Sequence, residues 1–151
     1  MSKTIWIVVA NRVTARIFAA ESPLGGIDEV ETLLHPEGRL PEQDLVSDKP
    51  GRTYDRAGPG RHATAPDTTQ HVHEATLFAA QIAAALAKAR TEDRYGTLVI
   101  AAPPAFLGAL RKALDAQTQS VVTLELDKDL AHLDARSLRA HLPERLVRRE
   151  T

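Results

Sequence analysis

Ile5-Trp6-Ile7-Val8-Val9-Ala10 is an unbroken apolar run near the start of the chain, and it decides the fold. A strand that is apolar without alternation is typical of the centre of a sheet covered on both faces. Thr97-Leu98-Val99-Ile100-Ala101 has nearly the same character much later in the chain. The two runs therefore predict the two central strands of one sheet.

Two further strands are predicted close behind the first run, at Thr14 to Ala20 and at Ile27 to Leu34. Asn11-Arg12 offers a short turn between the first two segments, and Pro23-Leu24-Gly25-Gly26 separates the second from the third. Short connections between successive strands indicate an antiparallel meander. The first three strands should therefore lie side by side in chain order.

The second half of the chain has helical spacing. Asp67 with Gln70 three residues later predicts an N-cap and a capping box, followed by a helix that runs to Arg90. Pro103-Pro104 predicts the start of the next helix, because proline fits the first helical turn. The remaining predicted elements are a strand at Val121 to Leu126 and a helix at Ala135 to Leu142.

This order of elements predicts an α/β fold with one mixed sheet. Each β-α-β connection should be right-handed, which places the fourth and fifth strands parallel to the first. The resulting five-stranded order is 3-2-1-4-5, a ribonuclease H-like sheet with flanking helices. The crevice beyond the carboxyl ends of the first and fourth strands is the natural ligand position in such a sheet.

The 151 residues suit a single domain, and we expect one over residues 1–151, with a long loop at about 35–69 and a basic C-terminal tail at about 143–151. The chain has no cysteine, which excludes disulfides and thiolate metal sites. Its formal net charge of −1 argues against global attraction to nucleic acid or membrane. The first apolar run is too short for a signal peptide or a membrane helix, so we expect a cytoplasmic protein without a membrane partner.

The segment from Pro36 to Thr69 differs from the rest, because it holds five of the nine prolines and four of the eight glycines. Loops of this length are uncommon in compact domains and are usually functional or disordered. Its five cationic and six anionic residues nearly balance. This balance disfavours nonspecific binding to a nucleic-acid backbone and favours internal ion pairs or recognition of a specific anion by a few arginines.

Residues that would support catalysis are sparse. A ribonuclease H-like nuclease needs carboxylates at the first strand, and Ile5 to Ala10 contains none. His71, His73 and Glu74 suggest metal, but residues two apart on a helix point in different directions, which favours ordinary polar residues of a first turn. No phosphate-binding glycine motif or nucleophile elbow is present. We therefore expect no metal, no cofactor and no catalytic residues.

The chain resembles the bacterial family of proteins required for attachment to host cells. Six segments carry the resemblance and cover most of the chain in order: His35 to Arg39, Asp44 to Arg52, Gly60 to Ala63, Glu74 with Phe78-Ala79, Ala102 to Gly108, and Asp127 to Leu130. This family is similar to the middle domain of archaeal and eukaryotic peptide-release factors, which implies the ribonuclease H-like arrangement. The Gly-Gly-Gln tip of release factors is absent, so the resemblance does not imply peptide release.

Three hypotheses for function remain open. The first is a non-catalytic binding or regulatory protein that contacts the ribosome, an RNA–protein complex or another anionic partner through its arginine-rich loop. The second is an enzyme that acts on a small phosphorylated or carboxylated substrate, and the third is a homo-oligomer that uses the loop across an interface. The candidate anion-binding residues are Arg39, Arg52, Arg61, His62 and Lys128, with Asp48, Glu74 and Asp129 as supporting or acid/base residues.

Overall fold

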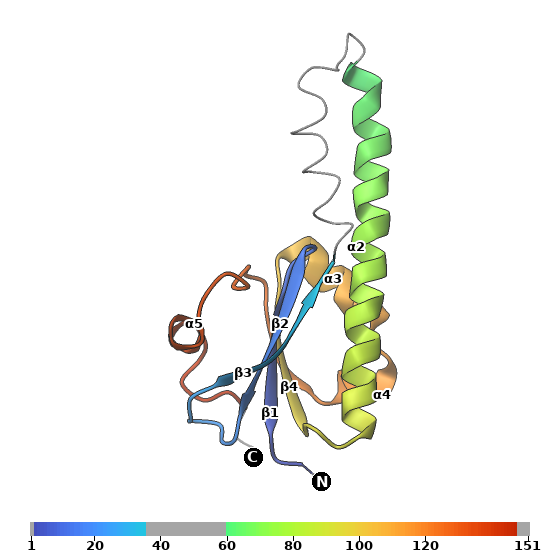
Figure 1. Ribbon diagram of the computed structural model, residues 1–151. Helices are drawn as coiled ribbons and strands as arrows, with labels where there is room; N and C mark the ends of the chain where they lie inside the picture. The colour runs from blue at the N-terminus through green and yellow to red at the C-terminus, as the bar shows by residue number, and fades with distance from the viewer. Residues whose placement is uncertain (1, 36–59, 148–151) are drawn as a thin grey trace.

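The computed structural model describes residues 2–35 and 60–147, with side chains of the long helix described from residue 72 onward. Figure 1 shows one twisted sheet with helices on both faces. The elements are β1 (Ile5–Ala10), β2 (Thr14–Ala20), β3 (Asp28–Leu34), α2 (Gly60–Thr91), β4 (Thr97–Ala101), α3 (Pro104–Ala113), α4 (Ala116–Ser120), β5 (Val122–Leu126) and α5 (Ala135–His141).

The five strands follow the order β3-β2-β1-β4-β5, which confirms the predicted sheet. β1 pairs antiparallel with β2, and β2 pairs antiparallel with β3, so the meander is present. β4 is parallel to both β1 and β5. All six residues of β1 are buried, as expected for a strand at the centre of a sheet covered on both faces.

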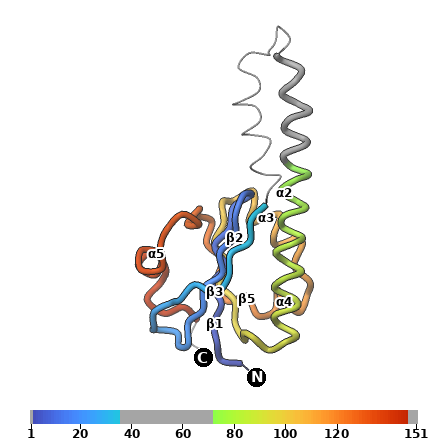
Figure 2. Tube along the Cα trace, in the orientation of Figure 1, coloured from blue at the N-terminus to red at the C-terminus, as the bar shows by residue number. Residues whose placement is uncertain are grey.

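Alternate residues of β1 supply two separate cores, because successive side chains of a strand point to opposite faces. Trp6 and Val8 belong to the cluster beneath α2 and α3. Ile7 and Val9 belong to the cluster on the other face, together with Leu138 of α5. Figures 1 and 2 show α2 and α5 on opposite sides of the sheet.

The start of α2 is the main correction to the predicted elements. We expected Asp67 as the N-cap with Gln70 as its capping partner, but α2 begins at Gly60 and passes through both positions. Residues 60–69, predicted as part of the long loop, are therefore helical. A capping signal shows only where a helix could begin, and it does not exclude a helix that runs through it, here past Pro66 directly before Asp67.

The two helices between β4 and β5 show which elements the local sequence predicts and which it does not. α3 begins as predicted, with Pro103 at the N-cap and Pro104 in the first turn. The short helix α4 was not predicted, although Asp115 is an ordinary N-cap whose carboxylate accepts a hydrogen bond from the Thr118 amide. α4 has only five residues, too few to show an apolar period.

The C-terminal segment adds buried surface after α5. Leu142 and Leu146 are both buried in the cluster on the α5 face. The amide of Leu146 also donates to the carbonyl oxygen of Pro23 at 2.9 Å, which attaches this segment to the turn between β2 and β3. Among the described helices, none combines the length and the apolar character needed to cross a bilayer.

Candidate functional site

A cavity of about 480 Å³ opens at the edge of the sheet where β1 and β4 end. We call this edge, with the turns that follow β1, β4 and β5, the carboxyl edge. The cavity lies where the sheet order predicts a ligand, beyond the carboxyl ends of parallel strands. Its volume falls within the usual range for small-molecule sites, about 300–1,000 Å³.

The apolar wall of the cavity comes from the two helices that cover this face. α2 contributes Val72 and Ala75, and α3 contributes Phe106 and Ala109. Phe106 packs against Phe78, with the two ring centroids 6.0 Å apart. Alanine on both helices leaves the space above the aromatic ring open, so the cavity follows from small residues on facing helices.

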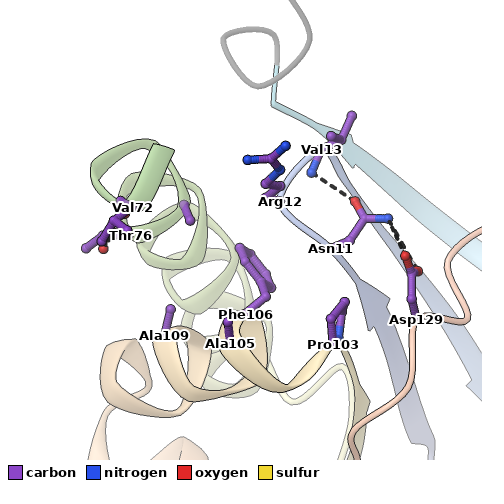
Figure 3. Close-up of a pocket in the computed structure, with 11 residues that line it drawn as sticks. Asn11, Arg12, Val13, Val72, Thr76, Pro103, Ala105, Phe106, Ala109 and Asp129 are labelled. Atoms are coloured by element: carbon purple, nitrogen blue, oxygen red, sulfur yellow. Dashed lines mark hydrogen bonds between the residues drawn. The ribbon is translucent and has the colours of Figure 1, made fainter. Parts of the chain in front are cut away.

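The polar wall is formed around Asn11, directly after β1. The Asn11 Oδ1 atom accepts hydrogen bonds from the Val13 and Thr14 amides, each at 2.9 Å. This arrangement closes the turn into β2, as an asparagine side chain often does. Its Nδ2 atom faces both carboxylate oxygens of Asp129 at 3.4 Å (Figure 3). Asn11 thus joins the turn after β1 to the loop after β5.

Arg16 of β2 fixes the loop that carries Asp129. Its guanidinium donates to the carbonyl oxygen of Ala131 at 2.9 Å and also to that of Leu133. Asp129 itself accepts from the Ala131 amide at 3.2 Å. Because Arg16 attaches this loop to β2, the 3.4 Å contacts with Asn11 are not the only interactions that hold Asp129 at the cavity.

Arg16 is in turn held by Glu29 of β3. The two side chains form two hydrogen bonds, of 2.9 and 3.1 Å, and the Thr32 hydroxyl donates to Glu29 at 2.7 Å. The hydrogen bonds from Arg16 and Thr32 lower the pKa of Glu29 from its ordinary 4.5 to about 2. The hydrogen bond with Glu29 likewise raises the pKa of Arg16.

We expect this pair to give the protein a specific sensitivity to acid. Since the pKa of Glu29 is lower in the folded state, its contribution to stability is complete above pH 4.5 and is lost as the pH falls towards about 2. Thermal melts of Glu29→Gln should show a shallower loss of stability over that interval than wild type. At neutral pH the cost should be only about 0.5–1 kcal/mol, because the Glu29 side chain is 37% exposed.

The matched control for this variant is Glu21→Gln, which neutralises an exposed carboxylate outside the pair. Its acid profile should follow that of wild type. Identical acid profiles for Glu29→Gln and wild type would contradict the assignment of this sensitivity to Glu29.

His35 lies beside the cavity wall, directly after β3. It is only 3% exposed and stacks on Phe78, with ring centroids 4.9 Å apart. Its amide donates to the carbonyl oxygen of Val13 at 2.9 Å, while its Nε2 atom has no hydrogen-bond partner among the described residues. His35 therefore packs the end of β3 against α2, beside the Phe78 ring that contacts Phe106 in the cavity wall.

The structure brings together only part of the predicted site. Asp129 lines the cavity, and Lys128 is exposed next to it. Glu74 is half-buried on α2 but is not among the residues that line the cavity. Arg61 and His62 belong to the first turn of α2 rather than to a loop, and their side chains lie outside the described residues.

The other predicted residues, Arg39, Asp48 and Arg52, lie outside the described residues. The described part of the chain contains no group of three metal-ligating side chains. The sequence-based prediction missed Asn11, Thr76 and Phe106 as cavity residues. Only Asn11 had a recognisable signal, an asparagine between a buried strand and a tight turn.

Comparison with known proteins points to one family. Residues 6–142 match the model of a family described as "Protein required for attachment to host cells". No curated protein matches the chain. A solved structure described as "Archaeal protein" is 12% identical, with a TM-score of 0.45, and the match covers 91% of this chain. It covers only 34% of that structure, so the chain spans about a third of its length.

Proposed function

Since this chain belongs to the family of proteins required for attachment to host cells, we propose that it is a non-catalytic binding protein whose partner is held at the carboxyl edge. The observation that carries the proposal is the cavity of about 480 Å³ between α2, α3 and the turn after β1. Its apolar wall with a few polar groups at one side is the usual character of a binding pocket.

The residues at the carboxyl edge, including His35 directly before the segment of residues 36–59, are the second support. His35 precedes the segment and contacts Val13 and Phe78, while Val72 and Thr76 of the following helix line the cavity. His35 therefore lies at the carboxyl edge, whereas Gly60, at the other end of the segment, is twelve residues and about 18 Å along α2 from Val72. The exposed Arg12, which lines the cavity, and the exposed Lys128 favour an anionic partner at this edge.

The ribosome, or another RNA–protein complex, is the first partner to test. This choice rests on the resemblance of the family to the middle domain of peptide-release factors. The near-neutral charge of the whole chain means that such binding would depend on a few placed cations rather than on a broad basic surface.

An enzymatic role for His62 and Glu74 has less support. The two residues are twelve positions apart on one continuous helix, which separates their backbones by about 18 Å along its axis. An acid and a base that act on one substrate must both reach it within a hydrogen bond. His62 and Glu74 therefore do not form a pair around a single reacting group.

The binding proposal is tested by filling the cavity. Ala109→Trp places an indole on the α3 wall, and we expect it to reduce co-sedimentation with ribosomes at least tenfold. Lys112→Trp is the matched control, because it adds the same side chain to an exposed position of the same helix that does not line the cavity. It should sediment like wild type.

A second variant tests the contribution of the arginines independently of the cavity. Arg52→Ala with Arg61→Ala should also reduce co-sedimentation while leaving the thermal melt unchanged. If wild type fails to sediment, the ribosome is not the partner. If wild type sediments and both the filled-cavity and the arginine variants sediment equally well, the carboxyl edge is not the binding surface.

A further inference from the structure

The outer edge of β3 is a second candidate binding surface, and its residues differ in charge and exposure from those of the cavity. β3 is the terminal strand of the sheet, so one of its edges pairs with β2 and the other has no paired strand among the described residues. Six of its seven residues are exposed. The unpaired backbone groups of such an edge are a template for another extended chain.

The side chains along this edge carry negative charge and no positive charge. Its sequence, Asp28-Glu29-Val30-Glu31-Thr32-Leu33-Leu34, contains three carboxylates and no cation. Arg16 from β2 neutralises Glu29, whereas Asp28 and Glu31 are exposed. Val30 and Leu34, which are 41% and 54% exposed, provide apolar contacts along the same strand.

This composition selects among the possible occupants. A second copy of β3 would bring three further carboxylates and no cation to the same edge, and like charges across paired strands are destabilising. A nucleic acid would be repelled by the same charges. An extended basic segment would satisfy both the backbone groups and the carboxylates, and exposed valine and leucine would contact its alternate apolar side chains.

The opposite edge of the sheet is less suited to such binding. Four of the five residues of β5 are half-buried rather than exposed. Glu125, its one exposed residue, already forms an ion pair with Arg111 of α3. Of the two outer edges of the sheet, β3 therefore has the more exposed residues and the carboxylates without an ion pair to a neighbouring helix among the described residues.

We propose that the outer edge of β3 binds an extended basic segment of a partner protein, which joins the sheet as an additional strand. Main-chain hydrogen bonds supply the affinity in this mode, and the side chains supply the selection. Asp28 and Glu31 oppose Ala19 and Ile17 of β2, so the irregular register of β3 places both carboxylates on one face of the strand. Basic residues at alternate positions of the segment pair with these two carboxylates, and its apolar residues contact Leu34 on the other face.

A blocked heptapeptide of alternating lysine and valine is the probe. Titration calorimetry at physiological salt should show binding to the full chain, and amide hydrogen exchange should slow within β3. A peptide with glutamate in place of lysine should bind at least tenfold more weakly. A peptide with a central proline should also bind at least tenfold more weakly, because it lacks an N–H for the ladder.

Variants of the protein locate the site. Glu31→Lys should weaken binding of the lysine–valine peptide about tenfold, whereas Glu92→Lys, which reverses an exposed charge beyond α2, should leave it within twofold. Circular dichroism of both variants checks that the fold is kept. The proposal is wrong if the peptide does not bind, or if the proline peptide binds as well as the original.

Slowed exchange outside β3, or equal binding by Glu31→Lys and wild type, would also overturn it. A single-stranded oligonucleotide at the same concentration should leave β3 exchange unchanged. Protection of β3 by that oligonucleotide would contradict the selection for basic protein segments.

Discussion

Phe78→Ala is expected to lower the free energy of unfolding by about 3–5 kcal/mol, the usual cost of removing a buried aromatic ring. Phe78 is 1% exposed and contacts two other rings, those of His35 and Phe106. It thereby joins the end of β3, the middle of α2 and the start of α3. Chemical denaturation followed by circular dichroism measures the loss, which is large beside a typical total stability of about 5–15 kcal/mol.

The neighbouring Leu77 provides the control for this substitution. It lies on the same helix but is 44% exposed, so Leu77→Ala should change the free energy of unfolding by less than about 1 kcal/mol. Similar losses for the two variants would show that the three-ring contact does not stabilise the fold.

Arg139→Ala is expected to cost about 2–3 kcal/mol, because a charged hydrogen-bond donor serves several backbone acceptors at once. Its guanidinium donates to the carbonyl oxygens of Gly25, Pro143 and Glu144 at 2.7–2.8 Å, and to that of Pro23 at 3.4 Å. These bonds join α5, the segment that follows it and the turn between β2 and β3. Thermal and chemical denaturation should both report the loss.

Two variants test whether the geometry or the charge of Arg139 matters. Arg139→Lys keeps the charge but not the planar fork of donors, so it should recover less than half of the lost stability. Arg136→Ala removes an exposed arginine from the same helix and should be nearly neutral. Equal stability of Arg139→Ala and Arg136→Ala would contradict a clamping role for Arg139.

The carboxyl edge and the outer edge of β3 are two surfaces that favour partners of opposite charge. The first combines an apolar cavity with the exposed Arg12 and Lys128, and we propose an anionic partner for it. The second is acidic and extended, and we assign it a basic segment. If both proposals hold, the protein binds two partners of opposite charge at separate surfaces.

Local patterns were a good guide to the elements whose signals are strong. The unbroken apolar character of β1 and β4 predicted their central places, and short turns predicted the meander. Proline at the start of α3 predicted its first turn. The same kind of reasoning was wrong at Asp67, where a plausible capping box lies inside α2, because a local cap marks a possible helix start and does not exclude a helix that continues through it.

The sequence by itself determined the sheet order, because apolar runs, turn lengths and the handedness of crossovers leave few alternatives. Only the tertiary structure placed Asn11 against Asp129, 118 residues apart, and set Phe106 across from Val72. It also decided which arginines clamp backbone carbonyls and which remain exposed. Periodicity reports which face of an element is buried, whereas a cavity or a long-range hydrogen bond depends on how several elements meet in space.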